Sequence, residues 1–251
     1  MCKTCVSLFG GLVLAQTIGF TRFLAYFFRL NAIFSRSDIQ VLLMTLLPIS
    51  NRSSRAHLQG VKTLDSLLAE VRACRACADV LPLGPRPIVQ VSTTARVLIA
   101  SQAPGTKVHD SGIPFFDASG DRLREWMGVS MEEFYDESRV AIVPMGMCYP
   151  GRSQRGGDAP PRPECAPLWR KRLLANMSDL RLSLLVGTHA QVHALGRGRM
   201  AERVMGFRDH LPAIFPLPHP SWRSRHWAVQ NPWFDADVLP ALRDAVKDAL
   251  A

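Results

Sequence analysis

The sequence predicts an α/β fold of three layers, α/β/α, built on a central four-stranded parallel sheet. Three observations predict it: four short apolar runs bounded by turn-forming residues, helical patterns between them, and a length that suits one sizeable core. The chain has 251 residues, of which 47% are hydrophobic. Strands that alternate with helices along a chain favour a parallel sheet with both faces covered.

The expected elements begin at residue 64. A helix over residues 64–73 carries Leu64, Leu67, Leu68 and Val71 on one face. The four strands are short and apolar, as buried parallel strands are, and cover residues 96–100, 140–143, 182–186 and 213–217. Further helices are expected over residues 119–127, 165–177, 188–195 and 234–250.

The first 57 residues differ from the rest. Apolar patches over residues 6–15 and 23–28 are interrupted by polar or charged residues before they reach membrane-spanning length, and a clear signal-peptide cleavage site is missing. We expect residues 1–57 to form a poorly ordered or weakly helical extension, with Met44 as an alternative start. Residues 58–251 are expected to form one domain, with no membrane partner.

The charge favours an anionic partner. The net charge is +9, and arginine supplies most of the positive charge, which suits bidentate contacts with phosphates. The six cysteines are not needed as disulfide staples in a chain of this length. We therefore expect a monomer in the reducing cytoplasm, with no obligate protein partner.

Four cysteines have the spacing of a metal site. Cys74 and Cys77 form a close pair, and Cys148 and Cys165 follow at a distance. Thiolates are the ligands of iron–sulfur clusters and of structural zinc, so both groups remain open on spacing alone. Cys2 and Cys5 form a second close pair, but they have no partner pair and belong to the extension.

Three loops follow strands of the predicted sheet and carry Gly or Pro beside polar groups: residues 102–105, 145–155 and 218–221. Functional loops of parallel sheets gather at the carboxyl ends of the strands. We therefore expect these three loops to meet and to form the functional site.

These loops carry a family resemblance. The motif Ser101-Gln102-Ala103-Pro104-Gly105 resembles the first motif of uracil-DNA glycosylases, and His219-Pro220-Ser221 resembles the second. Between them, Gly112-Ile113-Pro114-Phe115 with Gly120 resembles the segment that follows the first motif. The cysteine spacing is similar to that of the iron–sulfur, family 4-type branch, and the resemblance covers about residues 64–250. It implies a DNA glycosylase of base-excision repair with a [4Fe–4S] cluster on Cys74, Cys77, Cys148 and Cys165, with zinc as the alternative.

Three positions depart from the pattern. Pro144 stands where the branch has a uracil-recognising Asn, His109 stands where an acidic residue is usual, and Ser101 replaces the first glycine. Uracil specificity and catalysis are therefore less secure than the fold. The alternative function is a non-catalytic nucleic-acid-binding relative that keeps the fold and the metal cluster.

The resemblance and the chemistry together give the expected site. Catalytic groups are Gln102, His219 and His109, with Asp110 and Asp117 as further candidates for positioning water. The base is expected to contact Ala103, Phe115 and Met145, with stacking on Phe115. The expected DNA contacts are Ser221, Arg223, Arg225 and Arg152.

Overall fold

The computed structural model describes residues 63–154 and 156–251, apart from the side chain of Arg223. They belong to one compact unit, Lys62–Ala251. The predicted extension, with Met44, Cys2 and Cys5, lies outside the described residues.

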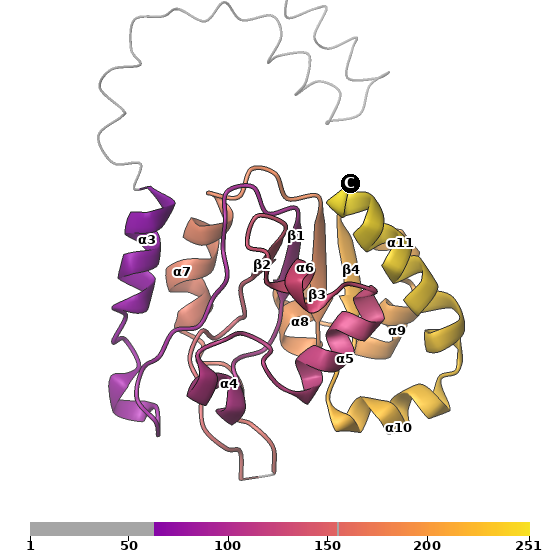
Figure 1. Ribbon diagram of the computed structural model, residues 1–251. Helices are drawn as coiled ribbons and strands as arrows, with labels where there is room; N and C mark the ends of the chain where they lie inside the picture. Colours follow the sequence, from indigo (N-terminus) through magenta and orange to yellow (C-terminus); the bar gives the residue numbers. More distant parts are fainter. Residues whose placement is uncertain (1–62, 155) are drawn as a thin grey trace, which may run out of the picture. The chain divides into compact units, whose positions relative to one another are not determined.

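The centre of the fold is a parallel sheet of four strands (Figure 1). The strands are β1 (Val97–Ala100), β2 (Val140–Ile142), β3 (Leu182–Val186) and β4 (Ile214–Leu217). Their order is β2-β1-β3-β4, with Ile99 of β1 in register with Ile142 and with Leu184. Almost every strand residue is buried, because helices cover both faces. The predicted α/β class and four parallel strands are confirmed.

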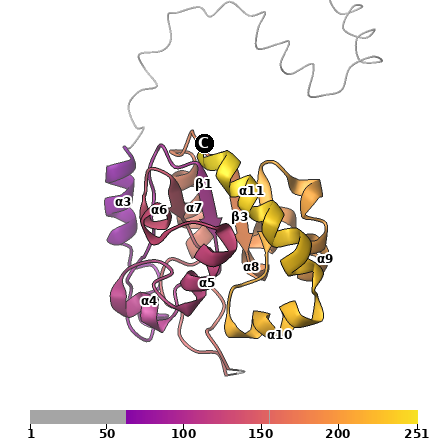
Figure 2. The same ribbon diagram turned by 45° about the vertical axis from the view of Figure 1, so that its right-hand side comes forward.

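The two faces of the sheet carry different helices (Figure 2). Val97 and Ile99 of β1 belong to the core shared with α5 (Ala118–Met127), α6 (Met131–Tyr135) and α11 (Leu239–Leu250). Leu98 points the opposite way, into the core shared with α3 (Leu64–Arg72) and α7 (Cys165–Leu174). Successive residues of a strand face opposite sides, so one short strand anchors both helical layers. Helix α8 (Thr188–Leu195) packs through Ala190 onto Ala100 and Leu185.

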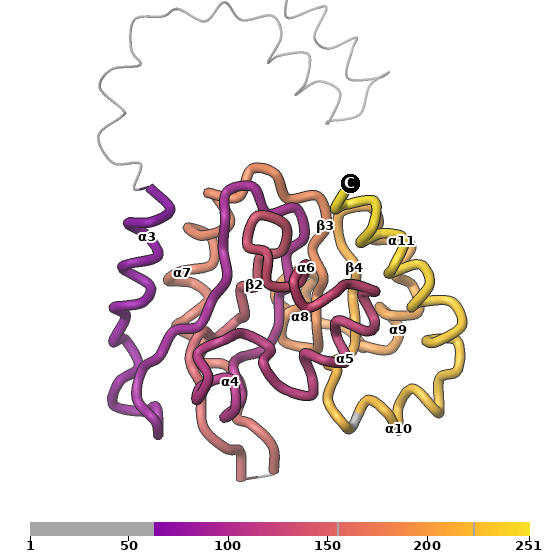
Figure 3. Tube along the Cα trace, in the orientation of Figure 1, coloured from indigo at the N-terminus to yellow at the C-terminus, as the bar shows by residue number. Residues whose placement is uncertain are grey.

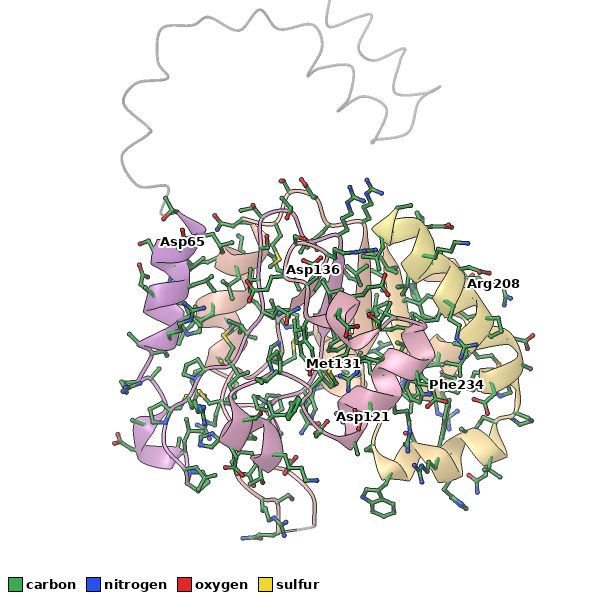
Figure 4. All side chains as sticks on the ribbon, in the orientation of Figure 1. Asp65, Asp121, Met131, Asp136, Arg208 and Phe234 are labelled. Carbon is green, nitrogen blue, oxygen red and sulfur yellow. The ribbon has the colours of Figure 1, made fainter. Side chains whose placement is uncertain are left out.

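Several short elements were not predicted. They are η1 (Ala78–Val80), α4 (Thr106–Ser111), α6, α9 (Met200–Met205), η2 (Phe207–His210) and α10 (Trp222–Gln230). Most have too few residues for an apolar period to show. The last predicted helix begins with a π-helical turn, η3 (Phe234–Val238), before α11. Phe234, labelled in Figure 4, packs edge-on against Trp126 of α5 with ring centroids 5.0 Å apart. None of the described helices has the length and hydrophobicity to cross a membrane.

The order of the strands changes direction between β1 and β3 (Figure 3). From β1 the chain moves outward to β2, then crosses back to β3 and continues to β4 on the other side. Loops at the carboxyl ends of β1 and β3 therefore lead away from each other. Such switch points are where open α/β sheets bind their ligands.

Candidate active site

A cavity of about 570 Å³ lies at the carboxyl ends of the strands. Its walls come from the loop after β1, the segment before α5, the start and far end of the long connection after β2, and the loop after β4. Apolar surface comes from Ile88, Val108, Phe115 and Ile142, and polar groups from Gln102, Asp117, Asp158, His219 and Ser221. The structure thus brings the predicted loops after β1 and β4 together around one space large enough for a nucleobase, whereas no described residue of the predicted loop 145–155 lines it.

Gln102 and Ala103, predicted in the site, both line this cavity. The Gln102 side-chain amide donates to the carbonyl of Ala159 at 3.1 Å, and the Gln102 carbonyl accepts from the Gly146 amide at 2.9 Å. The residue therefore ties the loop after β1 to both ends of the connection after β2. One N–H of its side-chain amide is engaged, which leaves the second N–H and the side-chain oxygen for a ligand.

Phe115 lines the cavity in an unusual backbone conformation. Its φ is 55°, in the left-handed region that non-glycine residues seldom occupy. Gly120 makes this possible, because a Cβ there would lie 1.7 Å from the Phe115 carbonyl oxygen. The Phe115 ring also packs edge-on against Phe134 at 6.2 Å, while Phe116 is exposed. Backbone strain of this kind concentrates at functional sites, and here it fixes an aromatic ring in the wall.

His219 stands in the loop after β4, close to Gly187 at the end of β3. A Cβ on Gly187 would lie 3.3 Å from the Cβ of His219, so glycine leaves room for the imidazole. Burial lowers the pKa of His219, and the nearby Asp117 carboxylate partly offsets this. The imidazole is therefore neutral near pH 7 and offers one N–H as a donor.

Arg122, which was not predicted from the sequence, contacts the loop after β4. The Arg122 guanidinium on α5 donates to the Ser221 carbonyl at 2.7 Å, and the Ser221 amide donates to the His219 carbonyl at 2.8 Å. Ser221 and Trp222 line the cavity, and Trp222 is 75% exposed at the start of α10. Arg225 is exposed on the same helix, which also carries Arg223.

Two carboxyl groups reach the cavity. Asp117 caps α5 through one oxygen, which accepts from the amides of Ser119 and Gly120 at 3.0 and 2.9 Å. Asp158 was missed, because nothing in its local sequence marks it and only the fold brings it to Gly105. Partial burial raises the pKa of Asp158, an effect that Arg152 opposes and Asp117 reinforces.

The structure places four predicted residues outside the cavity wall. His109 is buried on α4 with its ring 6.1 Å from that of Tyr149, and Met145 is buried against Ala100 and Leu185. Neither lines the cavity. Arg152 is exposed and forms a β-bridge with Asp158, so it lies beside the cavity rather than in its wall. Asp110 is exposed, and its carbonyl accepts from the Arg86 guanidinium at 3.0 Å.

The four predicted ligand cysteines line one second, much smaller cavity of about 20 Å³. Cys74 follows α3, Cys77 precedes η1, Cys148 lies in the connection after β2, and Cys165 begins α7. All four are free thiols. Among the described residues, no three His, Cys, Asp or Glu side chains are arranged to hold a single metal ion.

These thiols are partly buried, and hydrogen-bond donors lie near them. The Cys165 sulfur accepts from the Met147 amide at 3.3 Å, and the Cys148 sulfur accepts from the Arg86 backbone. The Arg162 guanidinium lies within hydrogen-bonding reach of Cys77. Burial raises the pKa of Cys148 to about 11 and also raises that of Cys165. Four sulfurs with backbone and arginine donors are a donor set that suits a Cys-ligated group.

A family model for the uracil DNA glycosylase superfamily matches residues 88–243. This span is more than half of the chain and contains the whole sheet and every residue that lines the cavity. It includes Cys148 and Cys165 but begins after Cys74 and Cys77. The match therefore supports the resemblance of the motifs and leaves the iron–sulfur branch as a prediction.

Proposed function

The chain belongs to the uracil DNA glycosylase superfamily, and we propose that it hydrolyses the N-glycosidic bond of uracil or a related deaminated base in DNA. The observation that carries the proposal is that one cavity is lined both by Phe115, whose backbone is strained, and by His219, whose pKa is lowered by burial. A base turned out of the helix needs a stacking surface and a donor for its carbonyl oxygen. This cavity offers both.

The residues suggest how the bond is cleaved. The C1′–N bond breaks with its electron pair on the departing base, and the His219 N–H stabilises the charge that develops on the base oxygen. Water bonds to C1′, and the Asp117 oxygen that does not cap α5 accepts its proton, which then passes to solvent. The base leaves as an anion and takes up a proton in water. Phe115 holds the base in place throughout.

DNA binding is assigned to the rim beside His219. Arg223 and Arg225 lie on α10, which starts at the cavity, and Ser221 is the residue before it. The exposed guanidinium group of Arg225 suits contact with a phosphate beside the flipped nucleotide. Arg152 pairs with Asp158 on the connection after β2, beside the cavity.

We also propose that Cys74, Cys77, Cys148 and Cys165 bind one [4Fe–4S] cluster. The support is that all four sulfurs line the same small cavity although they come from three separate segments. The group would supply folding energy there, since it ties the end of α3 to the start of α7 and to the connection between them. Zinc on the same thiols is the alternative.

Release of free base tests the proposed reaction. Protein purified without oxygen is incubated with single-stranded and duplex DNA that contains uracil, hypoxanthine or xanthine, and free base is measured by chromatography. We expect release from at least the uracil substrate. If no base is released while the protein keeps its metal and binds the DNA, the glycosylase hypothesis is wrong. The protein is then a non-catalytic nucleic-acid-binding relative. Pro144, which lines the cavity without a side-chain donor or acceptor, is the observation that favours that second reading.

A further inference from the structure

Asp158 is the acidic side chain of the cavity that no motif accounts for. We propose that its carboxylate contacts the edge of the flipped base and selects bases that carry a ring N–H beside a carbonyl group. The inference rests on the proposed glycosylase function and adds a specificity-determining residue to it.

The position of Asp158 is built into the fold. The carbonyl of the next residue, Ala159, accepts from the Gln102 side chain at 3.1 Å, and the Ala159 amide donates to the Gly151 carbonyl at 2.8 Å. On the other side, a Cβ on Gly105 would lie 3.3 Å from an oxygen of Asp158. The carboxyl group is therefore held directly against the loop after β1, and the absence of a side chain at Gly105 gives it space.

The remaining polar groups of the cavity have other partners or other tasks. Pro144 offers no side-chain donor or acceptor, and the Gln102 amide donates to Ala159. One oxygen of Asp117 caps α5. Asp158 is exposed, lines the cavity and has one carboxyl oxygen beside Gly105 of the loop after β1. It is thus the acidic group best placed to meet a base edge.

A carboxylate at this position would distinguish deaminated bases from cytosine and adenine. Cytosine and adenine present a ring nitrogen lone pair beside an amino group, whereas uracil and hypoxanthine present a ring N–H beside a carbonyl. A carboxylate only accepts hydrogen bonds, so it attracts the N–H and repels the lone pair. A hydrogen bond to a charged group is strong enough for about 10- to 100-fold discrimination.

The test compares Asp158→Asn and Asp158→Ala with the wild-type protein. Glu137→Gln is the matched control, because Glu137 is an exposed acid just before β2, at the opposite end of the strands. Single-turnover release is measured on DNA with uracil, hypoxanthine, cytosine or adenine. We expect Asp158→Asn to lower the uracil-to-cytosine and hypoxanthine-to-adenine ratios about 10- to 100-fold, since its amide N–H can pair with a ring nitrogen. Asp158→Ala should slow uracil release by a similar factor.

Unchanged ratios in both variants would overturn the proposal. An equal loss of rate on every base would also overturn it, because Asp158 would then act on the water rather than on the base. Binding separates this inference from the proposed reaction. DNA with 2′-fluoro-2′-deoxyuridine or 2′-fluoro-2′-deoxycytidine resists cleavage, and wild-type protein should prefer the first. Loss of that preference in Asp158→Asn supports base reading even if no base is released, and an equal preference in both proteins sinks it.

Discussion

Two of the cavities in the described part of the protein share one connecting segment but differ in size and in lining. The cavity at the strand ends is large, about 570 Å³, and mixes a strained aromatic wall with titratable side chains. The cysteine cavity holds about 20 Å³ and has four thiols in its lining. The first cavity is large enough to admit a ligand and to surround it with chemical groups. The second cavity is small, and its four thiols suit a bound group that stabilises the fold.

The connection after β2 contributes lining residues alternately to the large and the small cavity. It passes Pro144 at the large cavity, Cys148 at the small one, Asp158 at the large one again and Cys165 at the small one. Arg86 adds a further link, because its backbone donates to Cys148 while its guanidinium donates to the Asp110 carbonyl at 3.0 Å. A group bound by the cysteines would therefore fix the position of the segment that carries Asp158.

The largest expected effect comes from breaking the cysteine site. Cys148→Ala or Cys165→Ala should cost several kcal/mol of folding stability, because a bound metal group contributes its binding free energy to the fold. Wild-type protein purified without oxygen should be brown, with broad absorption near about 400 nm, and the variants should lose the colour and melt earlier. Cys2→Ala combined with Cys5→Ala is the matched control and should change neither property. A colourless wild-type protein with stoichiometric zinc would contradict the cluster.

The second effect is on catalysis in the large cavity. His219→Ala should slow single-turnover base release by about 10²–10³-fold, because a donor to the developing negative charge is lost, while DNA binding changes little. The control is His226→Ala, which removes an exposed imidazole of α10 whose ring lies 3.1 Å from the Gln230 amide. A His219→Ala protein with the wild-type rate would remove His219 from the mechanism.

The third effect concerns the rim of the large cavity. Arg223→Ala combined with Arg225→Ala should weaken binding to all DNA sequences and flatten the salt dependence by about 1.8 on a log–log plot, if each arginine neutralises one phosphate. Arg197→Ala combined with Arg199→Ala, both exposed between α8 and α9, serves as the control for lost positive charge. Equal slopes in the two double variants would move the DNA interface elsewhere.

The smallest effect is a pH dependence of stability. Burial lowers the pKa of His219 in the folded protein, so the unfolded chain binds this proton more readily. Stability should therefore be fully present above the unfolded pKa of about 6.5 and fall as the pH drops through the folded value. Thermal melts of wild-type protein and His219→Gln between pH 5 and about pH 8 check this. The difference in melting temperature between the two proteins should shift in favour of His219→Gln at the acid end, and a constant difference would contradict the sign.

Some features of the site follow from local sequence. The apolar runs at residues 97–100, 140–142, 182–186 and 214–217 are short and bounded by turns. These two features are sufficient to predict buried parallel strands. Once the strands are placed, the rule that their carboxyl ends meet brings Gln102, Ala103 and His219 to one place. The spacing of the four cysteines likewise predicts one shared site, and all four line the small cavity.

Tertiary structure alone decided the direction of individual side chains. Met145 follows the cavity residue Pro144 by one position, yet it turns into the core beside Ala100 and Leu185. Val108 reaches the cavity and His109 does not, because neighbouring residues of a helix point about 100° apart. Asp158 enters the cavity only because Gln102 and Gly151 hold Ala159 beside it. Periodicity and motif order are written along the chain, whereas these directions depend on contacts between segments far apart in sequence, and no local pattern records them.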